Sequence, residues 1–181
     1  MRAFDESAPS QELVPPLDRP ETPILHRSYA VGTWGCMTMT VWNGAVRPER
    51  VEAAAEEARR QCARHPTGGG FTIVIGSDTG LPPADSRRRA TIALREMSRY
   101  IHCATVVVEG TGLLAVTTRS VISLMFRATA RPIRLRVFAS VEEAACFQAE
   151  NVCTNMDIDS ARFATVLGDL VKRQRDLRAS T

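Results

Sequence analysis

Hydrophobic residues follow two different patterns, and the patterns alternate along the chain. Short unbroken apolar runs at Phe71–Ile75 and Ala104–Val108 are typical of strands that are covered on both faces of a sheet. Cys36–Trp42 instead alternates with a period of two, and with the β-rich stretch Arg27–Gly35 it predicts an opening hairpin. Ile133–Phe138 also alternates and predicts a further strand.

Longer segments with apolar residues three and four positions apart lie between and after these strands, and they predict helices. The segments are Arg47–His65, Pro82–Tyr100, Leu113–Ala130, Ser140–Asn151 and a last helix from Asp159 or Ser160 to Leu177. Ser140 and Glu143 have the spacing of a capping box, which satisfies free backbone amides at a helix start. The order β-β-α-β-α-β-α-β-α, with an extra C-terminal helix, indicates an α/β fold whose sheet is largely parallel after the hairpin.

The first 25 residues differ in composition from the rest of the chain. They contain five prolines and several acidic residues, and they lack the apolar core of an export signal. We therefore expect a disordered or extended tail over residues 1–25, one α/β domain over residues 26–151 and a helical extension over residues 152–181. No segment reaches the ~20 apolar residues of a membrane span, so we expect a soluble, cytoplasmic protein.

Charge and chemistry-bearing residues argue against several classes of function. The net charge of +3 is too mild to predict nucleic-acid binding. The five cysteines are odd in number and form no CxxC pair, so we expect reduced core thiols and neither a disulfide framework nor a zinc site. The glycine-rich loop Glu109–Gly112 lies between a strand and a helix but lacks the lysine and spacing of a phosphate-binding loop. We expect no catalytic residue, no metal and no cofactor.

The end of the domain, Arg136–Ala144, combines a strand, a small residue and a helix that starts with two glutamates and an alanine. Together with the element order, this segment resembles the STAS domain of the SpoIIAA-type anti-sigma-factor antagonists over Arg27–Asn151. The resemblance implies a non-enzymatic regulatory or scaffold protein that acts by protein–protein binding, with a kinase or an anti-sigma-type protein as partner. Phospho-switch members carry an Asp-Ser pair at the start of a helix, and Asp85-Ser86 lies at about that place, which makes Ser86 the candidate phosphoacceptor.

The segment around Ser86 is the candidate partner-binding surface. Its polar residues are Ser77, Asp78, Asp85, Arg87, Arg88 and Arg89. A phosphate in the first turn of a helix lies near free backbone N–H groups and the positive end of the helix dipole, and arginines supply counter-charges. The alternative is an ordinary first-turn serine beside a solvated row of arginines.

The third helical segment, Leu113–Ala130, is apolar around most of its circumference. A helix that packs on one face of a sheet needs a single apolar side, so the surplus predicts a second contact. The interface candidates are Leu114, Val121, Ile122, Met125 and Phe126. The last helix, the N-terminal tail, a second copy in a homodimer or a partner protein are the candidate covers. The same helix supports an alternative function, in which a small molecule or a lipid lies between helix 113–130 and the sheet.

Overall fold

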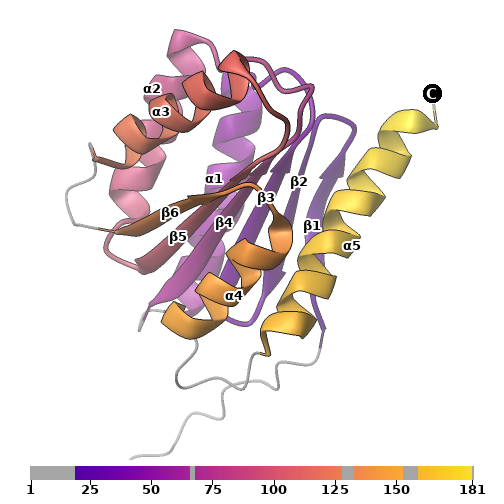
Figure 1. Cartoon of the computed structure of the whole chain (residues 1–181). Helices are drawn as coiled ribbons and strands as arrows, with labels where there is room; N and C mark the ends of the chain where they lie inside the picture. The colour runs from indigo at the N-terminus through magenta and orange to yellow at the C-terminus, as the bar shows by residue number, and fades with distance from the viewer. Residues whose placement is uncertain (1–18, 66–67, 128–132, 153–158, 181) are drawn as a thin grey trace, which may run out of the picture.

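A mixed sheet of six strands forms the centre of the computed structural model, which describes residues 19–65, 68–127, 133–152 and 159–180. The strands are β1 (Glu21–His26), β2 (Tyr29–Trp34), β3 (Met37–Trp42), β4 (Gly69–Ile75), β5 (Ile101–Val108) and β6 (Arg134–Phe138). They lie side by side in the order of the sequence, as Figure 1 shows. Neighbours from β1 to β3 are antiparallel, whereas β3 to β6 run parallel. The α/β class expected from the sequence is confirmed.

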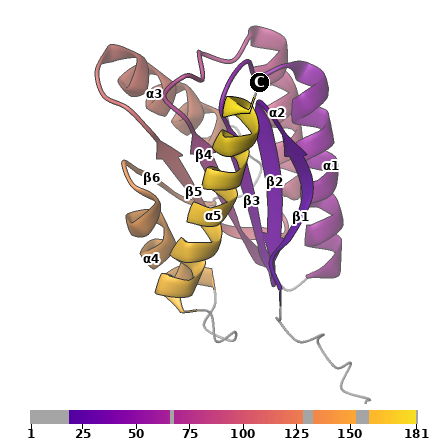
Figure 2. The ribbon, with the colours of Figure 1, turned by 90° about the vertical axis from the view of Figure 1, so that its right-hand side faces the viewer.

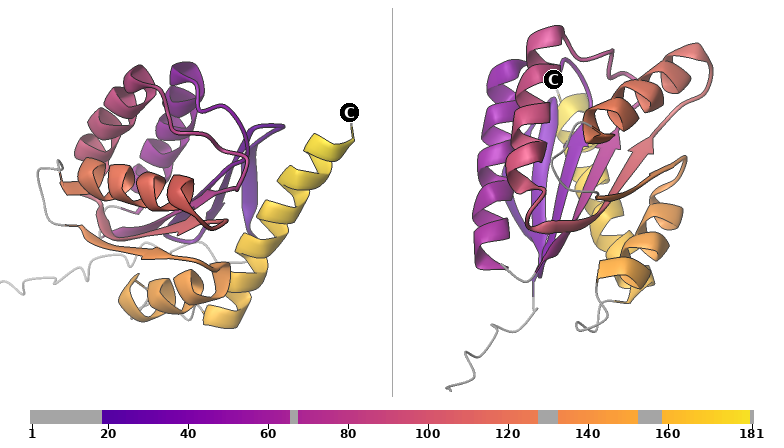
Figure 3. Two further views of the ribbon diagram at one scale, coloured as in Figure 1. Left: turned by 45° about the horizontal axis from the view of Figure 1, so that its top comes forward. Right: turned by 90° about the vertical axis from the view of Figure 1, so that its left-hand side faces the viewer.

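Helices cover both faces of the sheet. They are α1 (Pro48–Arg64), α2 (Ala84–Met97), α3 (Leu113–Arg127), α4 (Val141–Val152) and α5 (Ser160–Ala179). Crossovers between neighbouring parallel strands are right-handed, so α1, α2 and α3, which join β3 to β6, all lie on one face. Figures 2 and 3 show α4 and α5 on the opposite face. Within the described part of the chain, no helix has the length and apolarity needed to cross a membrane.

Each face of the sheet has its own apolar core, because side chains alternate along a strand. On the side of α4 and α5, Met39 and Val41 of β3 share a core with Phe163 and Leu167 of α5. The core on the side of α1, α2 and α3 includes Phe71, Leu94, Met97, Val106, Ile122 and Phe126. The alternation in β3 therefore does not mark a face in contact with water, since every residue of that strand is buried.

The N-terminal boundary of the folded part differs from the prediction. Glu21–His26 forms strand β1 and pairs with β2, so the extended segment before residue 26 belongs to the sheet from residue 21 onward. Pro23 fits this position because β1 is an edge strand. The outer side of an edge strand has no neighbouring strand, so a proline without a backbone N–H is tolerated there. The tail residues 1–18 lie outside the described residues.

The C-terminal helix α5 covers the sheet and does not cover α3, which lies on the other face (Figure 2). A buried amide pair holds α5 in place. The Gln174 side chain is fully buried, and its Nε2 donates to the carbonyl oxygen of Arg27 at 2.7 Å. Its Oε1 accepts a hydrogen bond from Nδ2 of Asn43. Residues 160–179 are thus an integral layer of the domain.

Candidate functional site

An apolar cavity of about 110 Å³ lies between the sheet and the three helices α1, α2 and α3. Its floor is made by alternate residues of two neighbouring strands, Thr40 and Trp42 of β3 with Phe71, Ile73 and Ile75 of β4. These side chains point to the same face because residues two apart on a strand do so, and the parallel register aligns the two strands.

Small residues on two helices leave this space open. Ala54 and Ala55 of α1 and Ala90 and Ala93 of α2 line the cavity, and an alanine side chain reaches only one carbon toward the sheet. The remaining helix residues of the wall are Val51, Leu94, Met97, Thr118, Ile122, Met125 and Phe126. The described lining contains no charged side chain, so the site suits an uncharged, apolar group.

The hydroxyl groups of two lining threonines are used within the protein. Oγ1 of Thr40 accepts a hydrogen bond from Nε1 of Trp42 at 3.2 Å. Oγ1 of Thr79 donates to the carbonyl oxygen of Trp42 at 2.7 Å and accepts from the backbone N–H of Gly44 at 3.3 Å. These contacts stabilise the wall and reduce the polarity that it presents to a ligand.

The cavity extends to the edge of the sheet where the parallel strands end. Val46, after β3, and Thr79, Gly80 and Pro82, after β4, contribute to its lining. Loops at the carboxyl ends of parallel strands are the usual place of ligand sites in α/β folds. The position of the cavity is therefore typical of a binding site.

Ser86 lies inside the fold and not on its surface. Its side chain belongs to the first turn of α2, but it is 1% exposed, and its Oγ donates to the carbonyl oxygen of Val46 at 2.7 Å. A kinase cannot reach this oxygen while the contact persists. The structure thus places the predicted phosphoacceptor in a structural hydrogen bond between α2 and the segment before α1.

The predicted partner-binding residues around Ser86 are spread over different contacts. Asp85 and Arg88 are exposed and lie 4.0 Å apart as a loose ion pair, whereas Arg89 pairs with Glu52 of α1. Exposed ion pairs of this kind contribute little to stability. Ser77 and Arg87 are exposed and half-buried, respectively.

The loop after β4 is tied to the C-terminal helix. Asp78 is exposed and pairs with Arg178 of α5 at 2.9 Å, and Nη1 of Arg178 also donates to the carbonyl oxygen of Asn43. These contacts place the end of α5 beside the loops at the carboxyl edge of the sheet.

The predicted interface residues of α3 mostly face inward. Ile122 and Phe126 are buried, and both line the cavity together with the half-buried Met125. Val121 is half-buried, and the side chain of Leu114 lies outside the described residues. The exposed apolar side chains of α3 are different ones, namely Leu113, Val116 and Leu124. Sequence reasoning missed them because an all-apolar helix does not reveal which side meets the sheet.

Burial keeps two core thiols protonated. Desolvation raises the pKa of Cys62 to about 11 and also raises the pKa of Cys103 to about 11, where Arg134 opposes the shift. Cys36 is buried as well, and Cys146 is exposed, while Cys153 lies outside the described residues. A protonated thiol is a poor nucleophile and metal ligand, so the geometry favours a packing role for the buried cysteines.

No group of three or more His, Cys, Asp or Glu side chains able to hold a metal lies among the residues that the structure describes. Burial, together with the nearby charge of Arg64, lowers the pKa of His65. This histidine follows α1 at the opposite end of the strands from the loops that line the cavity.

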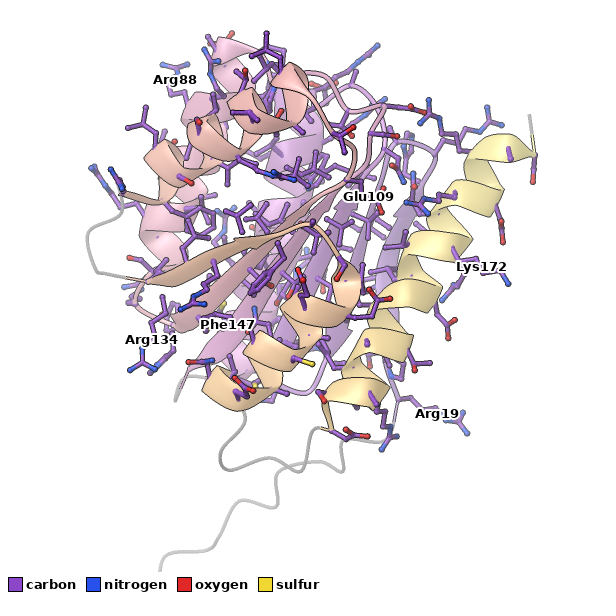
Figure 4. All side chains as sticks on the ribbon, in the orientation of Figure 1. Arg19, Arg88, Glu109, Arg134, Phe147 and Lys172 are labelled. Carbon is purple, nitrogen blue, oxygen red and sulfur yellow. The ribbon has the colours of Figure 1, made fainter. Side chains whose placement is uncertain are left out.

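A second hollow lies on the other face of the sheet, between the end of β5, the start of α4 and α5. Its volume is about 390 Å³, and its lining mixes acidic and basic side chains, among them Glu109, Glu142, Lys172 and Arg175. Glu109 and Arg175, which both line it, form an ion pair with each other. Figure 4 labels two residues of this lining, Glu109 and Lys172. The two cavities therefore differ in kind, since charged groups surround only the second.

The apolar cavity between α1, α2, α3 and the sheet is the candidate site. No protein-family model, curated protein or solved structure matches this chain.

Proposed function

We propose that this domain is a binding module for a small apolar molecule, or for an apolar part of a larger one, held between α3 and the sheet. The observation that carries the proposal is the cavity of about 110 Å³ with its apolar lining at the carboxyl edge of the sheet. The space is a pocket that is partly open to solvent, and it is larger than the voids that close-packed cores usually leave.

The size of the cavity limits what it accommodates. An engineered apolar cavity of about 150 Å³ in another protein stays dry and binds benzene, so a slightly smaller space suits one ring or a short branched hydrocarbon segment. Charged head groups are disfavoured inside it because a buried charge without a partner is costly. We infer that any polar part of the ligand stays outside, near Thr79 and Gly80 at the strand ends.

Benzene is a suitable first probe, because it tests the cavity without assuming the natural ligand. Addition of benzene is expected to shift the methyl NMR signals of Ile73, Ile122 and Met125, which line the cavity. Leu167 and Val171 belong to the core on the other face and serve as internal controls whose signals stay in place. Unchanged signals at the three lining residues, or equal shifts in both cores, would exclude the site.

Native mass spectrometry of the protein purified under gentle conditions then asks for the natural occupant. A retained mass that is lost from a variant with a filled cavity supports the proposal. A retained mass that persists in that variant places the occupant elsewhere on the protein.

A relationship to STAS domains is a second part of the proposal. It is supported by the order from β2 to α4, which matches the order expected for Arg27–Asn151, with β1 and α5 as additions. A regulatory role through protein binding is the corresponding second candidate function, and the exposed first turn of α2 with Asp85 and Arg88 favours it. We do not extend it to a phospho-switch, because Ser86 is buried and hydrogen-bonded. Capture of a defined partner that is lost with Arg88→Glu would support it, and capture unaffected by that change would contradict it.

A further inference from the structure

The outer face of α3 exposes large apolar side chains to water. Leu113 is 83% exposed, Leu124 is 69% exposed and Val116 is 55% exposed. Together with Ser120 and Arg127 they follow a spacing of three, four, four and three residues, which places all five on one side of the helix. The buried residues Ala115, Thr118, Ile122 and Phe126 lie on the opposite side.

The segment that carries this face is basic. Residues 84–127, which include α2 and α3, contain seven arginines and three acidic residues and so have a net charge of +4. Arg88, Arg95 and Arg127 are exposed, whereas Arg89 pairs with Glu52 of α1 and the half-buried Arg119 donates to the carbonyl oxygen of Val108. The whole chain has a net charge of +3, so the remainder is slightly acidic. Helix α3 itself contains no acidic residue, and Arg127 lies in its last turn. Figure 4 shows Arg88 of α2 pointing away from the molecule on the side of α2 and α3.

The combination of exposed leucines and a basic surround restricts the kind of partner. A second copy of the chain would bring two faces of the same positive charge together, which disfavours a homodimer through α3. Nucleic acid would meet the arginines but would leave Leu113, Val116 and Leu124 without apolar contacts. An anionic lipid surface satisfies both features, because apolar side chains enter the acyl boundary while arginines contact lipid head groups.

We propose that the α2–α3 face, defined by Leu113, Val116, Leu124 and the exposed arginines Arg88, Arg95 and Arg127, docks on anionic lipid membranes. From Leu113 to Leu124 the helix extends about 17 Å, which suits a helix that lies in the plane of the membrane surface. This inference concerns the surface and does not rest on the contents of the cavity. Docking would nevertheless bring α3, whose inner side lines the cavity, next to the membrane.

Vesicle flotation tests the docking directly. The full chain is expected to bind vesicles of phosphatidylcholine mixed with phosphatidylserine, and to bind vesicles of phosphatidylcholine alone much more weakly. Added salt should weaken the binding, because exposed charges are screened over about 10 Å at 0.1 M ionic strength. Absence of binding to the mixed vesicles, or binding that does not depend on the anionic lipid or on salt, overturns the proposal.

Variants locate the binding surface. The double change Leu113→Ser and Leu124→Ser is expected to lower vesicle affinity by about tenfold or more, because two exposed leucines lose their contact with the acyl region. Arg88→Gln should lower it about fivefold, as expected for one arginine near an anionic surface. The matched control is Leu25→Ser, since Leu25 is 37% exposed on the edge strand β1, outside this face. An equal loss in the control overturns the assignment to α3.

Two further measurements separate the proposal from its rivals. The melting temperature of the double variant should equal that of the original chain, because both leucines are exposed. Sedimentation should show a monomer with either sequence. A dimer that dissociates on Leu113→Ser and Leu124→Ser would instead assign the face to a second copy of the chain and refute the docking on lipid.

Discussion

Replacing Ala93 by leucine should fill the cavity and stabilise the protein. Ala93 lies on α2, is 6% exposed and lines the cavity, and the change adds three carbons. At about 24 cal/mol per Å³, a fully enclosed void of 110 Å³ would cost about 2.6 kcal/mol, and this space is partly open to solvent and costs less. Three buried methylene-sized groups, at about 0.8 kcal/mol each, give a similar value of about 2.4 kcal/mol. These figures are upper limits, because leucine does not match the shape of the cavity in every direction.

We therefore expect Ala93→Leu to raise the free energy of unfolding by about 1–2.5 kcal/mol, which corresponds to roughly 2–8 °C in melting temperature. Urea denaturation, followed by the fluorescence of the buried Trp34 and Trp42, measures the change. Ala161→Leu is the matched control, because it adds the same carbons at an exposed position of α5 and should alter stability little.

The same variant must also lose the response to benzene at Ile73, Ile122 and Met125. A loss of more than about 1 kcal/mol of stability would mean that α2 already packs tightly against the sheet at this position. A gain in stability combined with unchanged benzene binding would mean that benzene binds somewhere else. The loss of stability would refute the existence of the cavity, and the unchanged benzene binding would refute its assignment as the binding site.

Two further predictions concern the core. Gln174→Ala should lower the free energy of unfolding by about 2–5 kcal/mol, because the carbonyl of Arg27 and Nδ2 of Asn43 lose a buried partner. Arg173→Ala, on the exposed side of α5, is the control and should change this free energy by about 0.5 kcal/mol or less. Urea denaturation measures both. Equal effects of the two would contradict the role of the amide pair. In a Cys153→Ser background at pH 8, a thiol reagent should modify Cys146 rapidly and the core thiols slowly, because burial raises the pKa of two of them to about 11 and only the thiolate reacts. Rapid modification of more than one thiol in the folded chain would show that the core opens easily.

Local pattern was enough to place most elements of the fold. The apolar runs Phe71–Ile75 and Ala104–Val108 lie within β4 and β5, and the capping signal at Ser140 agrees with the start of α4, where Ser140 Oγ accepts from the N–H of Glu143. The helix N-cap at Asp159 is also observed, since its side chain accepts from the N–H of Ala161. These features depend on residues a few positions apart, so a single sequence carries them.

Strand β1 shows where local pattern fails. The prolines and acidic residues of the first 25 residues suggested a disordered or extended tail, yet Ile24 and Leu25 pair with Val31 and Ala30. The pairing depends on an unoccupied edge of β2, which belongs to the tertiary structure. An edge strand also tolerates proline, so the residue that argued against a strand did not exclude one.

By itself the sequence determined the class of fold, the approximate order of helices and strands and the apolar character of α3, because periodicity and capping are local properties. Only the tertiary structure decided which side of α3 faces the sheet, that α5 covers the opposite face, and that four alanines leave a cavity beneath α1 and α2. It also decided the burial of Ser86, whose hydrogen-bond partner Val46 lies 40 positions earlier in the chain. A side chain is buried only when a second part of the chain covers it, and here that part lies far away in the sequence.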